Sequence, residues 1–291
     1  MTDKAISPLR RRLIEDMTIR RLSANTQHQY IRHVKSFADF VGRSLDKATA
    51  EDVHRYQLHL GSIGTTIPTV NAGASALRFF FKVTLKRRDL ADTVVSVREP
   101  RRLPVVLSPE EVARLLASTT NIKHRAALSL TYATGLRRSE VVSLRLTDID
   151  SDRMLIRVEQ GKGKKDRYVI LSPHLLELLR EWWRVARKKG WMRPGQPWLF
   201  PGYHGQHMSA RQLHRLVRMA AARAGNCQAR WCSYVRHSFA THLLEQKTDI
   251  RVIQVLLGHK KLDTTALYTR VATSAIGEVT SPLDLLLKMP G

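Results

Sequence analysis

A basic stretch containing prolines divides this chain of 291 residues into two parts. It reads VREPRRLPVVLSPEE over residues 97–111, with three prolines and three arginines and little helical period. Proline holds itself and the residue before it in extended geometry, which disfavours a continuous helix here. The chain is also longer than a typical single domain. We therefore expect an N-terminal domain over residues 1–97, a linker over 98–107 and a second domain over 108–291.

The first part has the apolar spacing of helices. The segment TQHQYIRHVKSFADFVG, residues 26–42, places four apolar residues on one helical face. Thr26 and Gln29 have the spacing of a capping box, which predicts that Thr26 is the N-cap of this helix. Two more helices are predicted, over residues 50–60 and 71–85. The N-terminal domain is therefore expected to be a small helical one.

The second part begins with a clear helix start. Ser108 and Glu111 have the spacing of a capping box, and Pro109 stands at the first helical position. Gly135 is expected to end the next helix, because glycine commonly follows the last helical turn. The helices predicted in this part after the first cover residues 121–134, 173–188 and 209–224.

A small sheet is predicted between these helices. Two β-rich runs, Met154–Glu159 and Arg167–Leu171, flank a turn of glycine, lysine and aspartate. This pattern is typical of a β-hairpin. The expected fold class is thus mainly α with a small antiparallel β-sheet, a helical domain followed by an α+β domain.

Charge is the strongest compositional signal. The chain has 49 lysines and arginines against 25 aspartates and glutamates, a formal net charge of +24 that is spread along its length. Such a field attracts polyanions, and binding to them falls steeply with salt. DNA or RNA is therefore the first partner to expect, and an anionic membrane surface the second.

Other sequence features exclude several classes of protein. No apolar run approaches the length needed to cross a bilayer, and the opening stretch MTDKAISPLRRRL has no apolar core after its charges. Cys227 and Cys232 neither form a disulfide framework nor fit a zinc site. His204 and His207 lack partner ligands nearby in the sequence, so no metal is expected. These features favour a cytoplasmic protein without membrane association.

Four stretches of the second part carry residues suited to chemistry on a phosphate. They are TYATGLRRSEVVSLRL with Arg137, the hairpin tip GKGKKDR, YVRHSFATHLLE with Arg236, and LGHKKLDTTALYTRV with His259 and Tyr268. Guanidinium groups match phosphodiester oxygens, a lysine can protonate a leaving hydroxyl, and a tyrosine near cations can act as a nucleophile. Taken singly, Arg137 is more simply a surface arginine and Tyr268 more simply the cap of an apolar helix face, and the hairpin tip is equally a solvated turn. Together they favour phosphoryl transfer, for which no cofactor is required.

The order and the residues of these stretches resemble the sequence motifs of the tyrosine recombinases, also called phage-integrase-like or Xer-like recombinases. Near the N-terminus, LSANTQHQYIRHVKSFADF resembles the DNA-clamping helical domain of that family, and RRLPVVLSPEEVARLL resembles the start of its catalytic domain. The resemblance spans nearly the whole chain and implies a two-domain DNA clamp, with a catalytic domain over residues 108–291. The partner it implies is double-stranded DNA carrying recombination sites, bound by a homo-oligomer, a tetramer, together with any partner recombinase or accessory protein.

The resemblance also implies a role for each chemical residue. Arg137 and Arg236 correspond to the two arginines that bind the scissile phosphate. Lys162, on the hairpin, corresponds to the general acid that protonates the 5′-hydroxyl leaving group. His259 corresponds to a donor to the phosphate, and Tyr268 to the nucleophile that forms a 3′-phosphotyrosyl link. That link conserves energy, so strands are exchanged without ATP or a metal.

Ser233 departs from the family pattern. The second family box usually reads His, two residues, Arg, and in SYVR the histidine position is occupied by Ser233. A serine does not accept a proton as imidazole does. The preceding GNCQARWCSYV also looks foreign to the family. A local alteration through two compensating frameshifts, true divergence, or substitution by a nearby residue such as His237 would each account for it.

Three functions follow from this pattern. The first is a site-specific DNA recombinase or integrase of a mobile element or replicon. The second is a catalytically impaired DNA-binding protein of the same family, because loss of one general base lowers a rate by about 10²–10⁴. The third is a DNA-relaxing topoisomerase with the same chemistry, which ranks last because the N-terminal domain looks recombinase-like.

Overall fold

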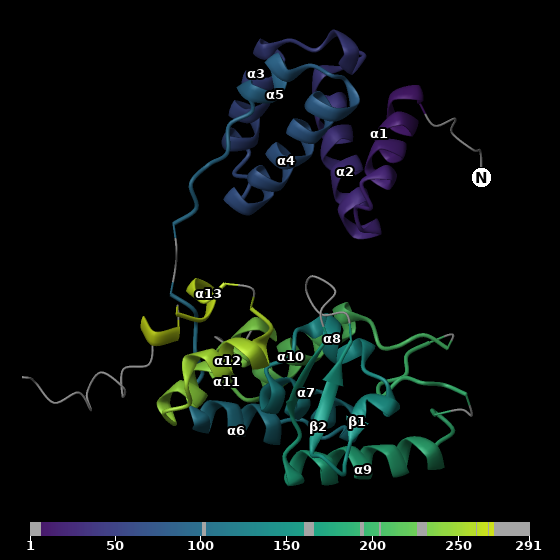
Figure 1. Ribbon diagram of the computed structural model, residues 1–291, viewed down its shortest axis with the longest axis vertical. Coiled ribbons are helices and arrows are strands. Elements are labelled where there is room, and N and C mark those ends of the chain that lie inside the picture. The colour runs from purple at the N-terminus through teal and green to yellow at the C-terminus, as the bar shows by residue number, and fades with distance from the viewer. Residues whose placement is uncertain are drawn as a thin grey trace, which may run out of the picture. The chain divides into compact units, whose positions relative to one another are not determined.

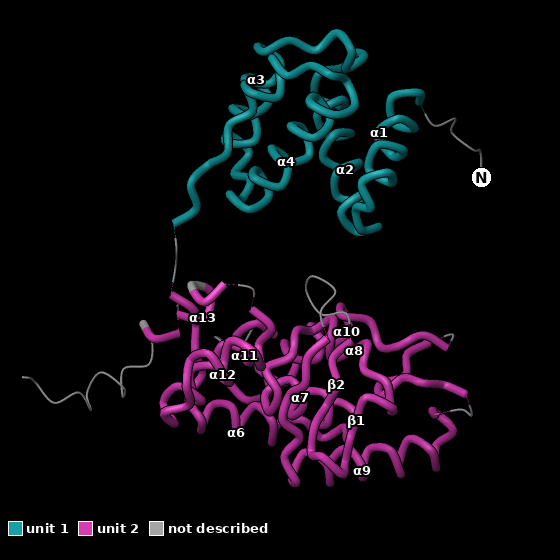
Figure 2. The backbone as a smooth tube through the Cα atoms, in the orientation of Figure 1, with its two compact units in different colours: residues 1–101 teal, residues 102–291 magenta. Residues whose placement is uncertain are grey.

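The computed structural model of the chain describes residues 7–100, 103–159, 166–192, 195–203, 205–225, 232–259, 261–266 and 268–270. The chain forms two compact units, residues 1–101 and 102–291, which Figure 2 shows in different colours. Each unit has its own hydrophobic core. The described part of residues 94–108 contains neither helix nor strand, as the proline-containing sequence predicts.

Unit 1 is a set of helices around an aromatic core. The ring of Phe37 meets Tyr56 edge-on, with ring centroids 5.1 Å apart, and meets Phe81 edge-on at 5.8 Å. All three side chains are buried. The elements of this unit are α1 (Pro8–Ile19), α2 (Ala24–Val41), the 3₁₀ turn η1 (Leu45–Lys47), α3 (Ala50–Ser62), α4 (Ile67–Phe79), the π-helical segment η2 (Phe80–Thr84) and α5 (Arg88–Thr93).

The predicted N-cap of α2 is wrong by three residues. The helix begins at Ala24, because the side chain of Ser23 accepts a hydrogen bond from the backbone N–H of Thr26 at 3.2 Å. Ser23 is therefore the N-cap, and Thr26 already lies in the first helical turn. Serine and threonine are comparable caps, so the sequence offered two starts and the structure uses the earlier one.

Unit 2 is mainly helical, and α7 (Ile122–Thr134) packs between α9 (Pro173–Lys188) and α11 (Cys232–Glu245), as Figure 1 shows. Two predicted helix ends are confirmed. Ser108 and Glu111 exchange both capping-box hydrogen bonds at the start of α6 (Pro109–Ala117), and Gly135 ends α7 in the left-handed conformation. The remaining helical elements are α8 (Arg138–Ser143), η3 (Leu146–Asp148), α10 (Ala210–Arg223), α12 (Ile250–Leu257), α13 (Asp263–Ala266) and η4 (Tyr268–Arg270).

The predicted hairpin is present and belongs to a three-stranded antiparallel sheet. Its strands are β2 (Leu155–Val158) and β3 (Arg167–Ile170), paired from Leu155 with Ile170 to Val158 with Arg167. The short strand β1 (Ile149–Asp150) pairs with β2 on its other side and was not predicted, because two residues are too short for a periodic signal. Residues 160–165, which include Lys162 and most of the hairpin tip, lie outside the described residues.

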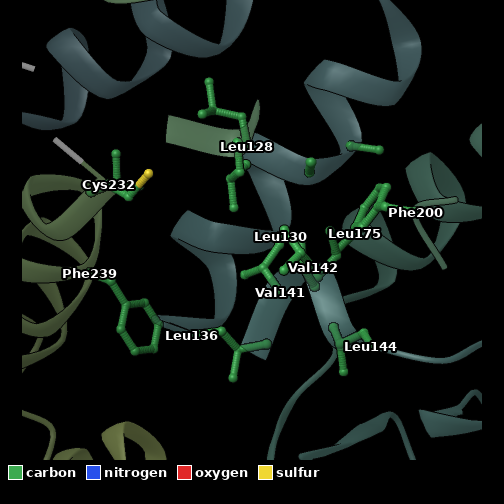
Figure 3. Close-up of a cluster of buried hydrophobic side chains, with 14 of the residues drawn as sticks. Leu128, Leu130, Leu136, Val141, Val142, Leu144, Leu175, Phe200, Cys232 and Phe239 are labelled. Atoms are coloured by element: carbon green, nitrogen blue, oxygen red, sulfur yellow. The ribbon is translucent and has the colours of Figure 1, made fainter. Parts of the chain in front are cut away.

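The core of unit 2 joins helices that are distant in the sequence. Figure 3 shows Leu128 and Leu130 of α7, Val141 of α8 and Phe239 of α11 in one buried cluster. The mainly helical fold with a small antiparallel sheet is therefore confirmed. Among the described residues, no helix is both long enough and apolar enough to cross a membrane.

Candidate active site

The predicted site residues come from four places in unit 2. Arg137 directly precedes α8, Arg236 lies in α11, His259 follows α12, and Tyr268 opens η4. The structure brings these four together: Arg137 and Arg236 both donate to backbone carbonyls at the end of α12, and the ring of Tyr268 stacks against His259. Lys162 lies outside the described residues.

Arg137 is held at the turn between α7 and α8. Its backbone N–H donates to the Glu140 carboxylate at 2.8 Å, and its Nη1 donates to the same carboxylate at 2.8 Å. Its Nη2 donates to the carbonyl of Gly258 at 3.1 Å. The side chain remains 23% exposed. The guanidinium is thus fixed in orientation while part of it faces solvent, where an anion can reach it.

Arg236 is the most deeply buried arginine of the site, with 7% of its surface exposed. Its Nη1 donates to the carbonyl of Gly135 and its Nη2 to the carbonyl of Leu257 at 2.6 Å. Burial, followed by the charge of Arg137, lowers the pKa of Arg236 to about 10. It therefore still carries its charge at neutral pH, in surroundings that poorly solvate it. Such a cation gains most from an anionic ligand.

The hydrogen bonds of His259 define its tautomer. Arg236 Nη2 is 3.2 Å from His259 Nε2, and an arginine can only donate, so Nε2 is the acceptor. His259 Nδ1 is 2.9 Å from the hydroxyl oxygen of Thr265 and is then the protonated nitrogen. The backbone of His259 is tied to Gln254 by two hydrogen bonds of 3.1 Å. These contacts fix the imidazole beside the guanidinium of Arg236.

Tyr268 is buried with 3% of its surface exposed, and its hydroxyl lies 3.0 Å from His237 Nδ1. Its ring is nearly parallel to that of His259, with centroids 6.4 Å apart. Burial raises the pKa of Tyr268, while the charges of Arg236 and Arg137 oppose that rise. The resting tyrosine is therefore a neutral phenol close to two cations.

Two further residues complete the site and were missed from the sequence. Arg167, the first residue of β3, makes a bidentate ion pair with Glu140, at 3.1 and 2.8 Å, and its Nε donates to the carbonyl of Leu256 at 2.9 Å. Burial favours a neutral Glu140, but hydrogen bonds from Arg167 and Arg137 outweigh it and lower the pKa of Glu140 to about 2. The capping-box spacing of Arg137 and Glu140 was a usable signal for the carboxylate.

Ser233 is exposed in the first turn of α11. It precedes Arg236 by three residues and His237 by four, so the three lie on one side of the helix. Cys232 beside it is buried, and burial raises the pKa of its thiol to about 11, which leaves it unreactive. Cys227 and the rest of residues 226–231 lie outside the described residues, as does His204.

This arrangement is suited to chemistry on a phosphodiester. Two arginines with fixed guanidinium groups and a histidine surround a phenol, and paired arginines bind the oxygens of a phosphate. Among the described residues, no group of three or more histidine, cysteine, aspartate or glutamate side chains is placed to hold a metal ion. The groups present supply binding of an anion and an oxygen nucleophile.

Known proteins are similar to this chain in both sequence and fold. The phage integrase family matches residues 105–275, and its N-terminal SAM-like domain matches residues 9–89. The chain is 45% identical to y4qK of Sinorhizobium fredii, across 97% of this chain and 90% of the relative. It is 31% identical to the tyrosine recombinase XerD of Halalkalibacterium halodurans, across 89% of this chain and 91% of that protein.

Solved structures support the same assignment. The crystal structure of XerA recombinase is 26% identical, with a TM-score of 0.54 over 97% of this chain and 99% of that one. A lambda integrase dimer bound to a core site shares the fold at 16% identity, with a TM-score of 0.73 over 94% of this chain and 97% of that one. This chain belongs to the phage integrase family, the tyrosine recombinases, which are enzymes that cleave and rejoin DNA.

Proposed function

We propose that this chain is a site-specific DNA recombinase that cleaves and rejoins strands through a 3′-phosphotyrosyl intermediate at Tyr268. The observation that carries the proposal is the assembly of Tyr268 with Arg137, Arg236 and His259, three separate motifs that converge on one phenol. Recombination of a mobile element or a replicon is the role that suits such an enzyme.

The arginines and His259 form the proposed phosphate site. Arg137 presents a partly exposed guanidinium, and Arg236 carries a buried charge that lacks a carboxylate partner among the contacts above. A phosphate between them would accept hydrogen bonds from the remaining N–H donors of both guanidinium groups. His259 lies at the same place, and it would donate to a phosphate oxygen once its Nε2, which now accepts from Arg236, carries a proton. The negative charge that develops during attack is then stabilised by groups already in position.

Tyr268 supplies the proposed nucleophile, and Lys162 the proposed acid. The phenolic oxygen forms a bond to phosphorus while the bond from phosphorus to the 5′ oxygen breaks, and Lys162 gives that oxygen a proton. The hairpin that carries Lys162 is anchored to the site at its base, because Arg167 binds both Glu140 and the carbonyl of Leu256. That anchor supports a lysine able to reach the phosphate.

Double-stranded DNA is the proposed partner. The net charge of +24 suits a polyanion, and the solved relatives include XerH bound to its difH substrate and lambda integrase bound to a core site. Residues 1–97 would form one half of a DNA clamp and residues 108–291 the catalytic half, with residues 98–107 between them. A tetramer on DNA, with or without an accessory protein, is the assembly that strand exchange between two sites requires.

Ser233 supports a second candidate, a DNA-binding protein of this family whose cleavage is impaired. The residue is exposed one helical turn before Arg236, where the family pattern has a histidine. This candidate keeps the clamp and the phosphate site but lacks a proton acceptor at position 233.

A covalent-trapping assay tests both candidates. The protein is incubated with labelled, nicked DNA fragments from its own locus, and adducts that survive denaturant are counted. An adduct formed by the wild type and lost in Tyr268→Phe supports the recombinase. An adduct formed only by Ser233→His supports the impaired protein. Relaxation of a supercoiled plasmid without a recombination site would instead identify a topoisomerase.

A further inference from the structure

The hydroxyl of Tyr268 has a defined partner that no motif of the sequence assigned to it. His237 Nδ1 lies 3.0 Å from that hydroxyl, and the two ring centroids are 5.7 Å apart at an interplanar angle of 47°. His237 is on α11, directly after Arg236 and one helical turn after Ser233. The contact therefore joins the proposed nucleophile to the helix from which the family histidine is missing.

The direction of this hydrogen bond depends on the protonation and the tautomer of the imidazole. Burial, followed by the adjacent charge of Arg236, lowers the pKa of His237 to about 4. The ring is therefore neutral at neutral pH, and a neutral ring with its proton on Nε2 accepts at Nδ1. In that tautomer the O–H of Tyr268, which burial keeps protonated by raising its pKa, donates to His237.

We infer that His237 is a catalytic residue that takes the proton of Tyr268 during cleavage, in the role left open by Ser233. The inference rests on the proposed function, because it gives the nucleophile its base. Position 237 is four residues after 233 on the same helix, so the two side chains leave α11 on one side. The base has moved by one helical turn while the nucleophile and the arginines keep their places.

The proton transfers balance in both directions. In cleavage the Tyr268 oxygen bonds to phosphorus, the bond to the 5′ oxygen breaks, the phenolic proton passes to His237 Nδ1, and Lys162 gives a proton to the 5′ oxygen. In rejoining a 5′-hydroxyl attacks the phosphotyrosine, its proton returns to Lys162, and the departing phenolate recovers the proton from His237. No oxidant, metal or nucleotide enters either step.

DNA binding makes His237 a stronger base. Among the described residues, the titratable and charged groups around the pair are Arg236 on its own helix, Arg137 before α8 and His259 after α12. The charge of Arg236 disfavours a positive charge on the imidazole, and an anionic phosphate bound beside that arginine offsets the effect. The pKa of His237 therefore rises when substrate is bound, in the direction that general-base catalysis requires.

The chain contains a matched pair that serves as a control. His242, on the same helix, has its Nδ1 2.8 Å from the hydroxyl of Tyr132, and its Nε2 lies 2.9 Å from the carbonyl of Leu107. This tyrosine–histidine contact joins the same kinds of group, one buried and one half-buried in each pair, but it lies outside the phosphate site. His242→Asn therefore measures how much the loss of such a contact changes the cleavage rate through structure alone.

The experiment compares single-turnover cleavage of a nicked substrate by the full chain, His237→Asn and His242→Asn. Asparagine retains an acceptor near Nδ1 but cannot be protonated, so folding is preserved while the base is lost. We expect His237→Asn to cleave about 10²–10⁴-fold more slowly and to lose the fall in rate that the wild type shows on acidification. His242→Asn should stay within about threefold of the wild type, at equal DNA affinity, because general-base catalysis is untouched.

Two further measurements distinguish the role of His237 as base from the role of Lys162 as acid. A substrate with sulfur in place of the bridging 5′ oxygen has a leaving group that needs no proton, so it should restore Lys162→Ala and leave His237→Asn slow. Adding Ser233→His to His237→Asn should recover at least about tenfold in rate.

Equal rates and equal pH profiles for His237→Asn and the wild type would overturn the inference while leaving the nucleophile in place. An adduct that persists in Tyr268→Phe, or no adduct from the wild type, would instead overturn the proposed function together with this inference.

Discussion

Glu140 and Arg167 form a bidentate ion pair, with donor–acceptor distances of 3.1 and 2.8 Å, in which both side chains are more than nine-tenths buried. The same carboxylate accepts two hydrogen bonds from Arg137. One acidic group therefore connects an arginine of the proposed phosphate site to the first residue of β3, the second strand of the hairpin. Arg167 also packs within 3.2 Å of the position that a Cβ on Gly258 would occupy, which ties it to the turn before His259.

Acid should weaken unit 2 through Glu140. Its pKa is about 2 in the folded chain and 4.5 ordinarily, so its contribution is complete above about pH 4.5 and is lost as pH falls toward 2. The shift corresponds to about 3 kcal/mol of unfolding free energy. Glu140→Gln should be destabilised by about 3–5 kcal/mol at neutral pH, because it leaves a buried cation unpaired, and this difference should shrink on acidification.

Tryptophan fluorescence measures this effect in unit 2 alone, because all five tryptophans of the chain lie between residues 182 and 231. Glu177→Gln is the control, since that exposed carboxylate pairs with Arg180 on the surface of α9. A difference between wild type and Glu140→Gln that stays constant from pH 7 to about pH 3 would contradict the assignment of the shift to this carboxylate.

Gly135→Ala should destabilise unit 2 strongly. Gly135 has φ of +60°, and an added Cβ would lie 2.3 Å from Phe239 Cδ1 and 3.0 Å from Leu257 Cδ2. Left-handed strain and overpacking together should cost about 2–5 kcal/mol. The same change should impair cleavage, because Arg236 donates to the carbonyl of Gly135.

Gly190→Ala isolates the backbone contribution. Gly190 has φ of +67°, but an added Cβ there meets nothing within 4 Å. We expect a loss of about 1–2 kcal/mol in urea-induced unfolding and unchanged cleavage. Equal losses for the two alanine variants would show that the contact with Phe239 is unimportant.

Binding to duplex DNA should depend steeply on salt. The net charge of +24 is compatible with many phosphate contacts, and 6–10 such contacts lower affinity by about 10³–10⁵ between about 50 and 200 mM salt. Fluorescence anisotropy at a series of salt concentrations gives the slope of log K against log salt. A slope near zero would show that the charge is not used for DNA.

The sequence predicted elements well where local chemistry decides them. The cap at Ser108, the helix end at Gly135 and the hairpin strands each depend on residues within a few positions of one another. The start of α2 was wrong because Ser23 and Thr26 are both good caps, and the spacing of Thr26 and Gln29 does not exclude the earlier one.

Contacts between segments that are distant in the chain could not be predicted from the sequence. The partner of Glu140 is 27 residues away, and the partner of the Tyr268 hydroxyl is 31 residues away. No period or motif spacing connects a strand end to a helix start, so Arg167 carried no signal of its role. His237 was named from the sequence as one possible substitute for the missing histidine, but the fold alone places it against the tyrosine.

The central claim is that Tyr268 becomes covalently attached to a DNA 3′ end. The most direct test is to isolate the denaturant-resistant adduct, digest its protein and DNA parts, and locate the nucleotide by mass spectrometry. The account predicts a nucleotide on the peptide that contains Tyr268, joined through its 3′ phosphate, with a free 5′-hydroxyl on the released strand. A nucleotide on any other residue, or one joined through a 5′ phosphate, would contradict it.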